Sequence, residues 1–212
     1  MLSSVLIVLG SYVVGAVPVA YLTGRLLRGI DIRQYGSGNI GPSNVWQNVS
    51  RPAVVPVGLT EIGQGLLGIL VAKAADESLT VQVLAGMAAL FGHNWSPFIG
   101  WYGGRGVGHA IGFMLVLSWP ALGAFIGISL VGVALRVVPQ LVGLGVVTAP
   151  LWALAAGESP EIVAGLAGMA ALIVAKRLLG NRAAVPGAAV LRNRLLYDRD
   201  TRERERWVQG KV

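Results

Sequence analysis

The sequence predicts an all-α fold: a polytopic integral membrane protein with about seven transmembrane helices. Three observations support this prediction. Hydrophobic residues make up 54% of the 212 residues and charged residues only 13%, whereas soluble domains carry roughly 25% charged residues. The mean hydropathy of +0.67 points the same way. Apolar runs alternate with short polar turns along the whole chain, which is typical of helical membrane proteins.

Seven apolar runs follow one another. The first, at residues 2–27, is too long for a cleaved signal peptide and lacks its basic start, so it predicts a retained helix. The other runs lie at residues 53–75, 79–91, 111–117, 121–135, 141–156 and 162–174. Several are shorter than the roughly 20 residues of a full crossing, so we expect some tilted or partial helices. Five crossings with re-entrant pieces is the alternative.

The distribution of charge predicts the orientation in the membrane. Two turns are not rich in basic residues: one carries Lys73 with Asp76 and Glu77, and the other carries two glutamates with no base. Positive loops favour the cytoplasmic side, so we expect the N-terminus outside and the C-terminus in the cytoplasm. The basic residues lie in alternate turns, at Arg25, Arg28, Arg33, Arg51, Arg105, Arg136 and from Lys176 onward.

The chain divides into one transmembrane helical domain at residues 1–180 and a polar, basic tail at residues 181–212. The tail holds eight Lys or Arg residues against four Asp or Glu residues. We interpret it as a solvated charged end; a dedicated lipid-binding element is the alternative.

Composition excludes several classes of function. The chain has no cysteine, which removes disulfides, thiol nucleophiles and cysteine-based metal sites. It has only two histidines, so a His-rich metal centre is not expected. The formal charge of +7 lies mostly beside apolar segments. That placement favours an anionic membrane leaflet over nucleic acid as a partner.

A glycine-rich stretch at residues 30–47 separates the first two apolar runs. Glycine permits positive φ and leaves no side chain between backbone N–H groups and an anion. Short polar side chains in the same stretch can reach the same oxygens. The stretch predicts a pocket for a phosphate or an anionic headgroup; a flexible connector is the alternative. Its glycines are Gly36, Gly38 and Gly41, and its short polar residues are Ser37, Asn39, Ser43 and Asn44.

A second polar stretch, at residues 92–112, contains Gly103-Gly104-Arg105-Gly106 directly before an apolar run. A helix N-terminus offers unpaired N–H donors, and arginine offers a bidentate fork for phosphate. Neither stretch has the Gly-Lys-Ser/Thr order of a Walker loop. Both are predicted on the same face of the membrane, which favours the phosphate pocket over a connector.

Three titratable residues lie within or beside apolar runs. Glu61 is a carboxylate expected inside the membrane, where such groups are costly and usually functional. We expect it to pair with Arg105 or Arg51. His93 is either an interfacial residue or a substrate ligand, and His109 is expected to pack or to reach the interface.

The two glycine-rich stretches resemble motifs of the bacterial membrane acyltransferases that use acyl phosphate and glycerol 3-phosphate, the PlsY type. Residues 36–45 match the motif Gly-Ser-Gly-Asn-x-Gly-Ala-Thr-Asn-Val, with Pro42 and Ser43 in place of Ala and Thr. Residues 92–93 match its Gly-His, and residues 103–107 match Gly-Gly-Lys-Gly-Val, with Arg105 for Lys. The resemblance is strong over about residues 8–112 and weak afterwards.

The sequence departs from this pattern at several cationic positions. Gln47 stands where the family has an arginine, and His109 stands where a threonine is usual. Residues 61–65 read Glu-Ile-Gly-Gln-Gly instead of Asp-x-x-Lys-Gly. The third family motif is barely recognisable around residues 176–181.

The resemblance implies a membrane acyltransferase of the bacterial cytoplasmic membrane. Its reaction would move a fatty acyl group from acyl phosphate to glycerol 3-phosphate, giving lysophosphatidic acid for phospholipid synthesis. Expected partners are these two substrates and membrane lipids, with no cofactor and no metal. Ser37 and Arg105 are the expected catalytic residues, and Glu61 and Arg33 are further candidates. Expected substrate-binding residues are Gly36, Gly38, Asn39, Gly41, Ser43, Asn44, His93, Gly103, Gly104 and Gly106.

Two other functions remain open from the sequence. The replaced cationic positions fit a non-catalytic relative that binds anionic lipid or a partner membrane protein. Glu61 and the glycine-broken runs allow a transporter of a phosphorylated solute, although the runs show no duplicated halves. The sequence predicts no oligomeric state.

Overall fold

The computed structural model of the chain describes residues 1–180 and 187–201. Within these residues every regular element longer than one isolated bridge is helical, which confirms the all-α prediction. Two short 3-10 helices lie at Ile32–Gln34 and Pro97–Ile99. The α-helices are α1 (Leu2–Ala16), α2 (Val19–Arg28), α3 (Pro42–Asn48), α4 (Val54–Ala74), α5 (Leu79–Asn94), α6 (Val107–Leu117), α7 (Trp119–Ala134), α8 (Val138–Ala155), α9 (Pro160–Leu179) and α10 (Ala188–Tyr197).

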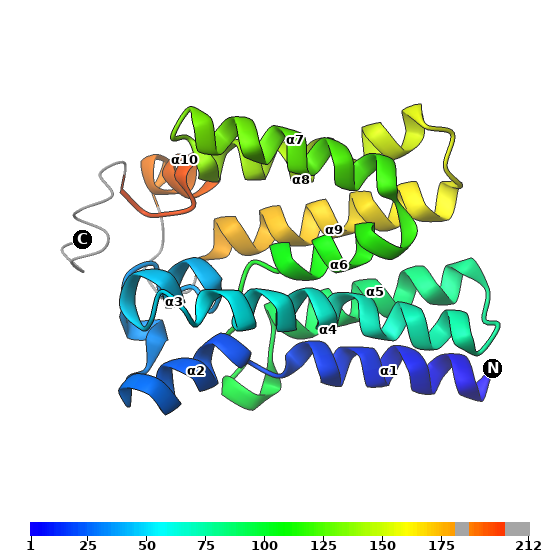
Figure 1. Cartoon of the computed structure of the whole chain (residues 1–212), viewed down its shortest axis with the longest axis horizontal. Helices are drawn as coiled ribbons and strands as arrows, with labels where there is room; N and C mark the ends of the chain where they lie inside the picture. The colour runs from blue at the N-terminus through cyan, green and yellow to red at the C-terminus, as the bar shows by residue number, and fades with distance from the viewer. Residues whose placement is uncertain (181–186, 202–212) are drawn as a thin grey trace.

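The long helices lie roughly along one direction and form a bundle (Figure 1). Helices α1, α4 and α5 make one side, α7 and α8 make the other, and α6 and α9 lie between them. The N-terminus and the α4–α5 and α8–α9 turns share one end of the bundle, whereas α2, α3 and α10 gather at the opposite end. Both glycine-rich stretches belong to this second end, which we call the loop end.

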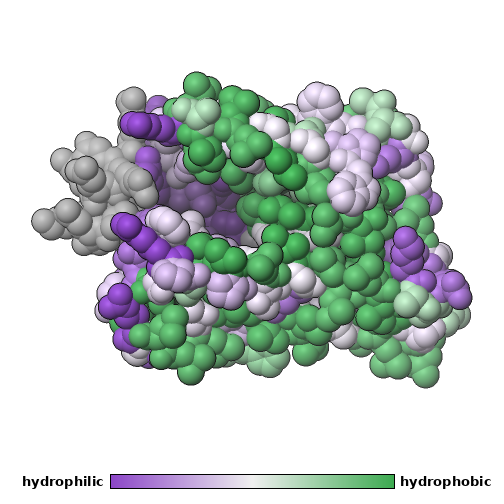
Figure 2. Space-filling view, viewed as in Figure 1, coloured by the Kyte–Doolittle hydropathy of each residue, from purple (hydrophilic) through white to green (hydrophobic). Residues whose placement is uncertain are grey.

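The outer surface of the bundle is apolar. Four helical segments are long and apolar enough to cross a membrane, namely Leu2–Arg28, α4, α8 and α9, and α6 and α7 are shorter apolar helices. Large apolar side chains such as Leu59, Leu130 and Leu151 are more than half exposed. Figure 2 shows a largely hydrophobic surface between the two ends. The chain is a multi-pass membrane protein; the count of seven crossings stays a prediction.

The first apolar run is two helices instead of the single predicted one. Helix α1 ends at Ala16, and Pro18, which has no N–H to continue the hydrogen-bond ladder, is the N-cap of α2. The side-chain amide of Gln64 donates to the carbonyl oxygens of Val14 (2.8 Å) and Val17 (3.1 Å). Gln64 therefore satisfies backbone groups at the break, which would otherwise be costly inside a membrane.

Close packing of small residues fixes the helices that carry the site. An added Cβ at Gly15 of α1 would collide with the backbone of Ala89 in α5. In the same way, an added Cβ at Gly65 of α4 would collide with the backbone of His109 in α6. Small residues at such contacts let membrane helices approach closely. The approach of α4 to α6 brings the polar side chains of both helices together inside the bundle.

The chain returns to the bundle after α9. Arg194 of α10 is 1% exposed and donates to the carbonyl oxygens of Leu178 and Leu179, both at 2.9 Å. These carbonyls end α9 and lack helical partners, so Arg194 caps that helix. Asp200 pairs with the same guanidinium at 2.5 Å.

The interpretation of the tail as a solvated end is therefore wrong for Arg194. Tail residues 181–186 and 202–212 lie outside the described part of the chain, and the division at residue 180 stays a prediction.

Candidate active site

The first glycine-rich stretch is held in place by an arginine. The guanidinium of Arg33 pairs with Asp31 (2.6 Å) and donates to the carbonyl oxygen of Ile99 (3.0 Å). It also lies over the rings of Tyr21 and Tyr102. The hydrogen bond from Arg33 lowers the pKa of Asp31, and the same bond raises the pKa of Arg33. Arg33, a candidate for substrate binding, thus ties the first loop to the α5–α6 connection.

Asn44 is the hub of the same loop. The sequence predicted an open loop to residue 47, but α3 begins at Pro42, where proline suits the first helical turn. The Asn44 amide nitrogen lies within 2.9–3.1 Å of the carbonyl oxygens of Ile32, Tyr35 and Asn39. Its oxygen accepts a hydrogen bond from Asn48 at 2.7 Å. Asn44 is buried and shapes the loop.

Ser37 lies at the tip of the loop between two glycines in the left-handed region, with φ of +52° at Gly36 and +64° at Gly38. An added Cβ at Gly36 would also lie 2.6 Å from the side chain of Asn48. Glycine is therefore required at that position. The Ser37 hydroxyl accepts a hydrogen bond from the backbone N–H of Asn39 (3.2 Å). Asn39 is buried behind the tip, and Gly41 precedes α3 in an extended conformation.

The second glycine-rich stretch packs against the first. The N–H of Gly104 donates to the carbonyl oxygen of His93 (3.1 Å). An added Cβ at Gly104 would collide with the His93 ring and with the carbonyl oxygen of Ile40. An added Cβ at Gly103 would collide with the backbone carbonyl oxygen of His93. Gly106, with φ of +81°, caps the N-terminus of α6. The two stretches were predicted only to share one face of the membrane; the structure brings them into direct contact, and these glycines make the contact possible.

Arg105 lies in this second stretch and is 6% exposed. Its Nε donates to Oδ1 of Asp198 at 2.7 Å. Nε of Arg177, in α9, lies 3.6 Å from the same oxygen. Arg177 also donates to the carbonyl oxygens of Leu195 and Pro139. Two guanidinium groups therefore converge on one carboxylate at the end of α10.

A cavity of about 690 Å³ opens at the loop end. The recess is visible in Figure 2 as a hydrophilic hollow beside hydrophobic walls. It brings the hydroxyl groups of Ser37 and Ser43 together with Asp198. Arg105 meets the cavity through its ion pair with Asp198. The lining residues are Ser37, Ser43, Trp46, Gln47, Val54, Val133, Arg136, Val138, Pro139, Gln140, Tyr197, Asp198 and Arg199.

A smaller, mostly apolar hollow of about 230 Å³ lies between α8, α9 and α10. It shares Gln140 with the larger cavity, and Arg177 lies on its wall. Its apolar lining residues are Leu144, Val146, Val147, Ile173, Val174, Leu195 and Leu196. An anionic group with an attached hydrocarbon chain can therefore place its two parts in adjoining hollows.

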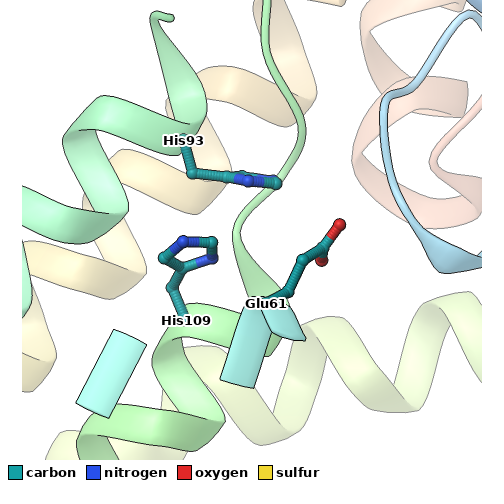
Figure 3. Close-up of side chains that lie close together, drawn as sticks. All are labelled: Glu61, His93 and His109. Carbon is teal, nitrogen blue, oxygen red and sulfur yellow. The ribbon is translucent and has the colours of Figure 1, made fainter. Parts of the chain in front are cut away.

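The expected partners of Glu61 are wrong. Arg105 pairs with Asp198, and Arg51 lies over the ring of Trp46 at 5.6 Å. Glu61 is 3% exposed, and it faces the two histidines (Figure 3). His93 and His109 are both buried inside the bundle.

Sequence reasoning missed Asp198 and Arg177. Both lie in the region where resemblance to the family motifs is weak. Asp198 is 93 positions from Arg105, and no local spacing predicts that contact. The alternation of charges in the tail was the only available signal.

The fold and this cavity define a class: multi-pass membrane proteins with a cavity lined by hydroxyl groups and charged side chains at one end of the helix bundle (Figure 1). The chain belongs to the glycerol-3-phosphate acyltransferase family, whose sequence model matches residues 5–183. A glycerol-3-phosphate acyltransferase of Synechococcus sp. (strain CC9902) is 40% identical over 165 residues, covering 77% of this chain and 82% of the relative.

Two solved structures share the fold. Both are of PlsY (YgiH), described as an integral membrane glycerol 3-phosphate acyltransferase. The glycerol 3-phosphate form has a TM-score of 0.78 and 24% identity, covering 95% of this chain and 96% of that chain. The lysophosphatidic acid form has a TM-score of 0.78 and 25% identity, covering 94% and 95%.

Proposed function

We propose that the protein transfers a fatty acyl group from acyl phosphate to the hydroxyl of glycerol 3-phosphate, giving lysophosphatidic acid. One observation carries the proposal. Arg105 and Arg177 converge on the Asp198 carboxylate in the cavity lined by Ser37. Guanidinium groups bind carboxylate and phosphate oxygens in the same way, so these two arginines could bind a phosphate oxygen in place of the Asp198 carboxylate.

The chemistry needs few catalytic groups. The substrate hydroxyl oxygen forms a bond to the acyl carbon while the bond from that carbon to the phosphate oxygen breaks. The departing phosphate can take the hydroxyl proton, so a strong protein base is not required. The protein must stabilise negative charge on the phosphate and on the carbonyl oxygen. Arg105 supplies charge for the leaving phosphate, and the Ser37 hydroxyl supplies a neutral donor beside it.

The acyl chain would lie in the smaller hollow between α8, α9 and α10. Since Gln140 belongs to both hollows, the reacting carbonyl would lie near this residue. The same arrangement would let the product, which keeps its acyl chain, leave sideways into the membrane.

We place the loop end on the cytoplasmic side, as the positive-inside rule favours. The chain has no cysteine, so single introduced cysteines can be labelled without background. In inverted bacterial membrane vesicles, Ser50→Cys at the loop end should react with an impermeant maleimide, and Asp76→Cys at the other end should not. The reverse pattern would contradict this orientation.

The activity test mixes purified protein with palmitoyl phosphate and radiolabelled glycerol 3-phosphate and measures labelled lysophosphatidic acid. We expect product from the natural chain and none from Ser37→Ala or Arg105→Ala. Lys73→Ala, a cation lost at the opposite end of α4, is the matched control and should keep full activity. Unchanged turnover in both cavity variants would contradict the proposal. Binding of acyl phosphate without transfer would indicate a non-catalytic relative.

A further inference from the structure

Glu61, His93 and His109 form a buried cluster inside the bundle (Figure 3). They come from three helices, α4, α5 and α6. Their potential ligand atoms all lie within 4.8 Å of one another. The two imidazole rings are tilted by 39° relative to each other, with centroids 4.4 Å apart. The reaction proposed above uses none of the three side chains.

The cluster is buried and short of hydrogen-bond partners. The exposed fractions of Glu61, His93 and His109 are 3%, 6% and 0%. Among the residues that the structure describes, Oε1 of Glu61 and both ring nitrogens of His109 lack a hydrogen-bond partner. Buried polar atoms are nearly always paired, and a carboxylate inside a membrane needs a compensating positive charge. Since the expected arginines are engaged elsewhere, the Glu61 carboxyl is either protonated or balanced by a cation from another source.

We propose that Glu61, His93 and His109 bind one divalent transition-metal ion, with Zn²⁺ the best fit. Two imidazoles and one carboxylate are a recurrent set of three protein ligands for zinc, leaving a fourth position for water. Calcium and magnesium prefer oxygen ligands, so they fit this set poorly. Zinc bonds of about 2.0–2.2 Å place tetrahedral ligand atoms roughly 3.4 Å apart. Small side-chain rotations would close the present separations to that value.

The ion would act as a positioning element for the α5–α6 connection. Gly104 packs against the His93 ring, and an added Cβ at Gly108 would lie 2.9 Å from Cβ of Glu61. A metal ion joining these side chains would tie α4 to both helices that flank Arg105. The ion would thereby fix the position of Arg105 relative to the first glycine-rich stretch, without touching the substrate.

The composition of the chain makes the test clean. His93 and His109 are its only histidines, and it has no cysteine. The full chain is purified without a histidine tag, dialysed against Zn²⁺ and analysed for metal content. We expect about one zinc per chain, and the intense visible absorption of a four-coordinate site when Co²⁺ replaces it. Thermal unfolding in detergent should shift upward on adding Zn²⁺.

Single variants locate the ion. Loss of groups that only support a metal ligand typically weakens binding about 10–100-fold. Removing a ligand itself, in His93→Gln, His109→Gln or Glu61→Gln, should therefore weaken zinc binding by at least about 100-fold. Glu161→Gln removes an exposed carboxylate near the start of α9 and should bind like the natural chain.

Two results would overturn the proposal. One is a natural chain that takes up no Zn²⁺ or Co²⁺ at micromolar concentrations. The other is a His109→Gln variant that binds as well as the natural chain, which would place the metal on surface carboxylates. The first result needs no variant, so misfolding of a variant cannot hide the answer. The measurement of metal content does not depend on acyl transfer. A chain that binds no metal and a chain that lacks acyltransferase activity are therefore separate outcomes.

Discussion

The Nε of Arg105 and the Oδ1 of Asp198 lie 2.7 Å apart although 93 positions separate them in the sequence. This ion pair joins the second glycine-rich stretch to the end of α10. The arginine is nearly buried and the carboxylate is 24% exposed toward the cavity. If the proposed phosphate site is right, the carboxylate competes with an anionic substrate group for Arg105.

Replacing Asp198 with asparagine should improve substrate binding. Charge-assisted hydrogen bonds are worth about 1.5–3 kcal/mol, so loss of the competing charge should lower KM for acyl phosphate about 10-fold. Asparagine tolerates the left-handed backbone of residue 198, where φ is +54°. Steady-state kinetics in detergent measures the effect. Asp76→Asn, at a similar φ of +52° in the α4–α5 turn, is the control. A raised KM would show instead that Asp198 helps to bind substrate.

Gly104→Ala should inactivate the protein without unfolding it. The added methyl group would collide with the His93 ring and the Ile40 carbonyl, and so push the two glycine-rich stretches apart. We expect acyl transfer to fall at least about 100-fold, because small misplacements of catalytic groups have effects of that size. Gly63→Ala in α4 has open space around its Cβ and should keep full activity. Equal activity of the two variants would refute the packing argument.

Asn44→Ala should destabilise the first loop. It removes the amide nitrogen that lies near three carbonyl oxygens and the oxygen that accepts from Asn48. At about 1 kcal/mol for each hydrogen bond, the free energy of unfolding should fall by about 3 kcal/mol. Asn48→Ala loses only the bond to Asn44 and should cost about 1 kcal/mol. Thermal or denaturant unfolding in detergent compares them. A similar loss for both variants would mean that Asn44 is not the hub.

The Asp31–Arg33 pair should make stability depend on pH in the acid range. The hydrogen bond from Arg33 holds the pKa of folded Asp31 below its ordinary value of 3.8. The unfolded chain therefore takes up the proton first as pH falls. The stabilisation from the pair is complete above about pH 4 and disappears as pH falls through the lower, folded pKa.

The variant Asp31→Asn keeps the shape of the side chain and removes this effect. The natural chain should be more stable than the variant at pH 6, and the difference should shrink steadily below pH 4. Melting temperatures of both proteins across that range provide the measurement. A difference that stays constant with pH would show that the charge of Asp31 contributes nothing.

Much of the fold was predictable because hydrocarbon allows few alternatives to the helix. The apolar runs correspond to the long helices, and both glycine-rich stretches meet at one end. The break at Pro18 was harder to predict, because its repair depends on Gln64, a residue 46 positions away in another helix. Local patterns carry no information about such a partner.

The site was predictable only in part, for a similar physical reason. Ser37 and Ser43 line the cavity, as their short hydroxyl side chains in a glycine loop suggested. Asn44 and Arg33 have the chemistry of substrate ligands, yet the fold uses both to hold the loop. Glu61 was expected to pair with a cation, but helix packing places two histidines beside it. The substrate roles assigned to Asn44 and Arg33, like those of the glycines, Ser37 and the other site residues, stay predictions.

The return of α10 to the loop end governs when the protein becomes competent during its synthesis. Tyr197, Asp198 and Arg199 form one wall of the cavity, and the ribosome makes them after all the long helices. A polypeptide released just past α9 would carry every apolar helix and both glycine-rich stretches. It would nevertheless lack that wall and the cap that Arg194 places on α9. Premature termination near the 3′ end of the message would therefore yield inserted but inactive protein.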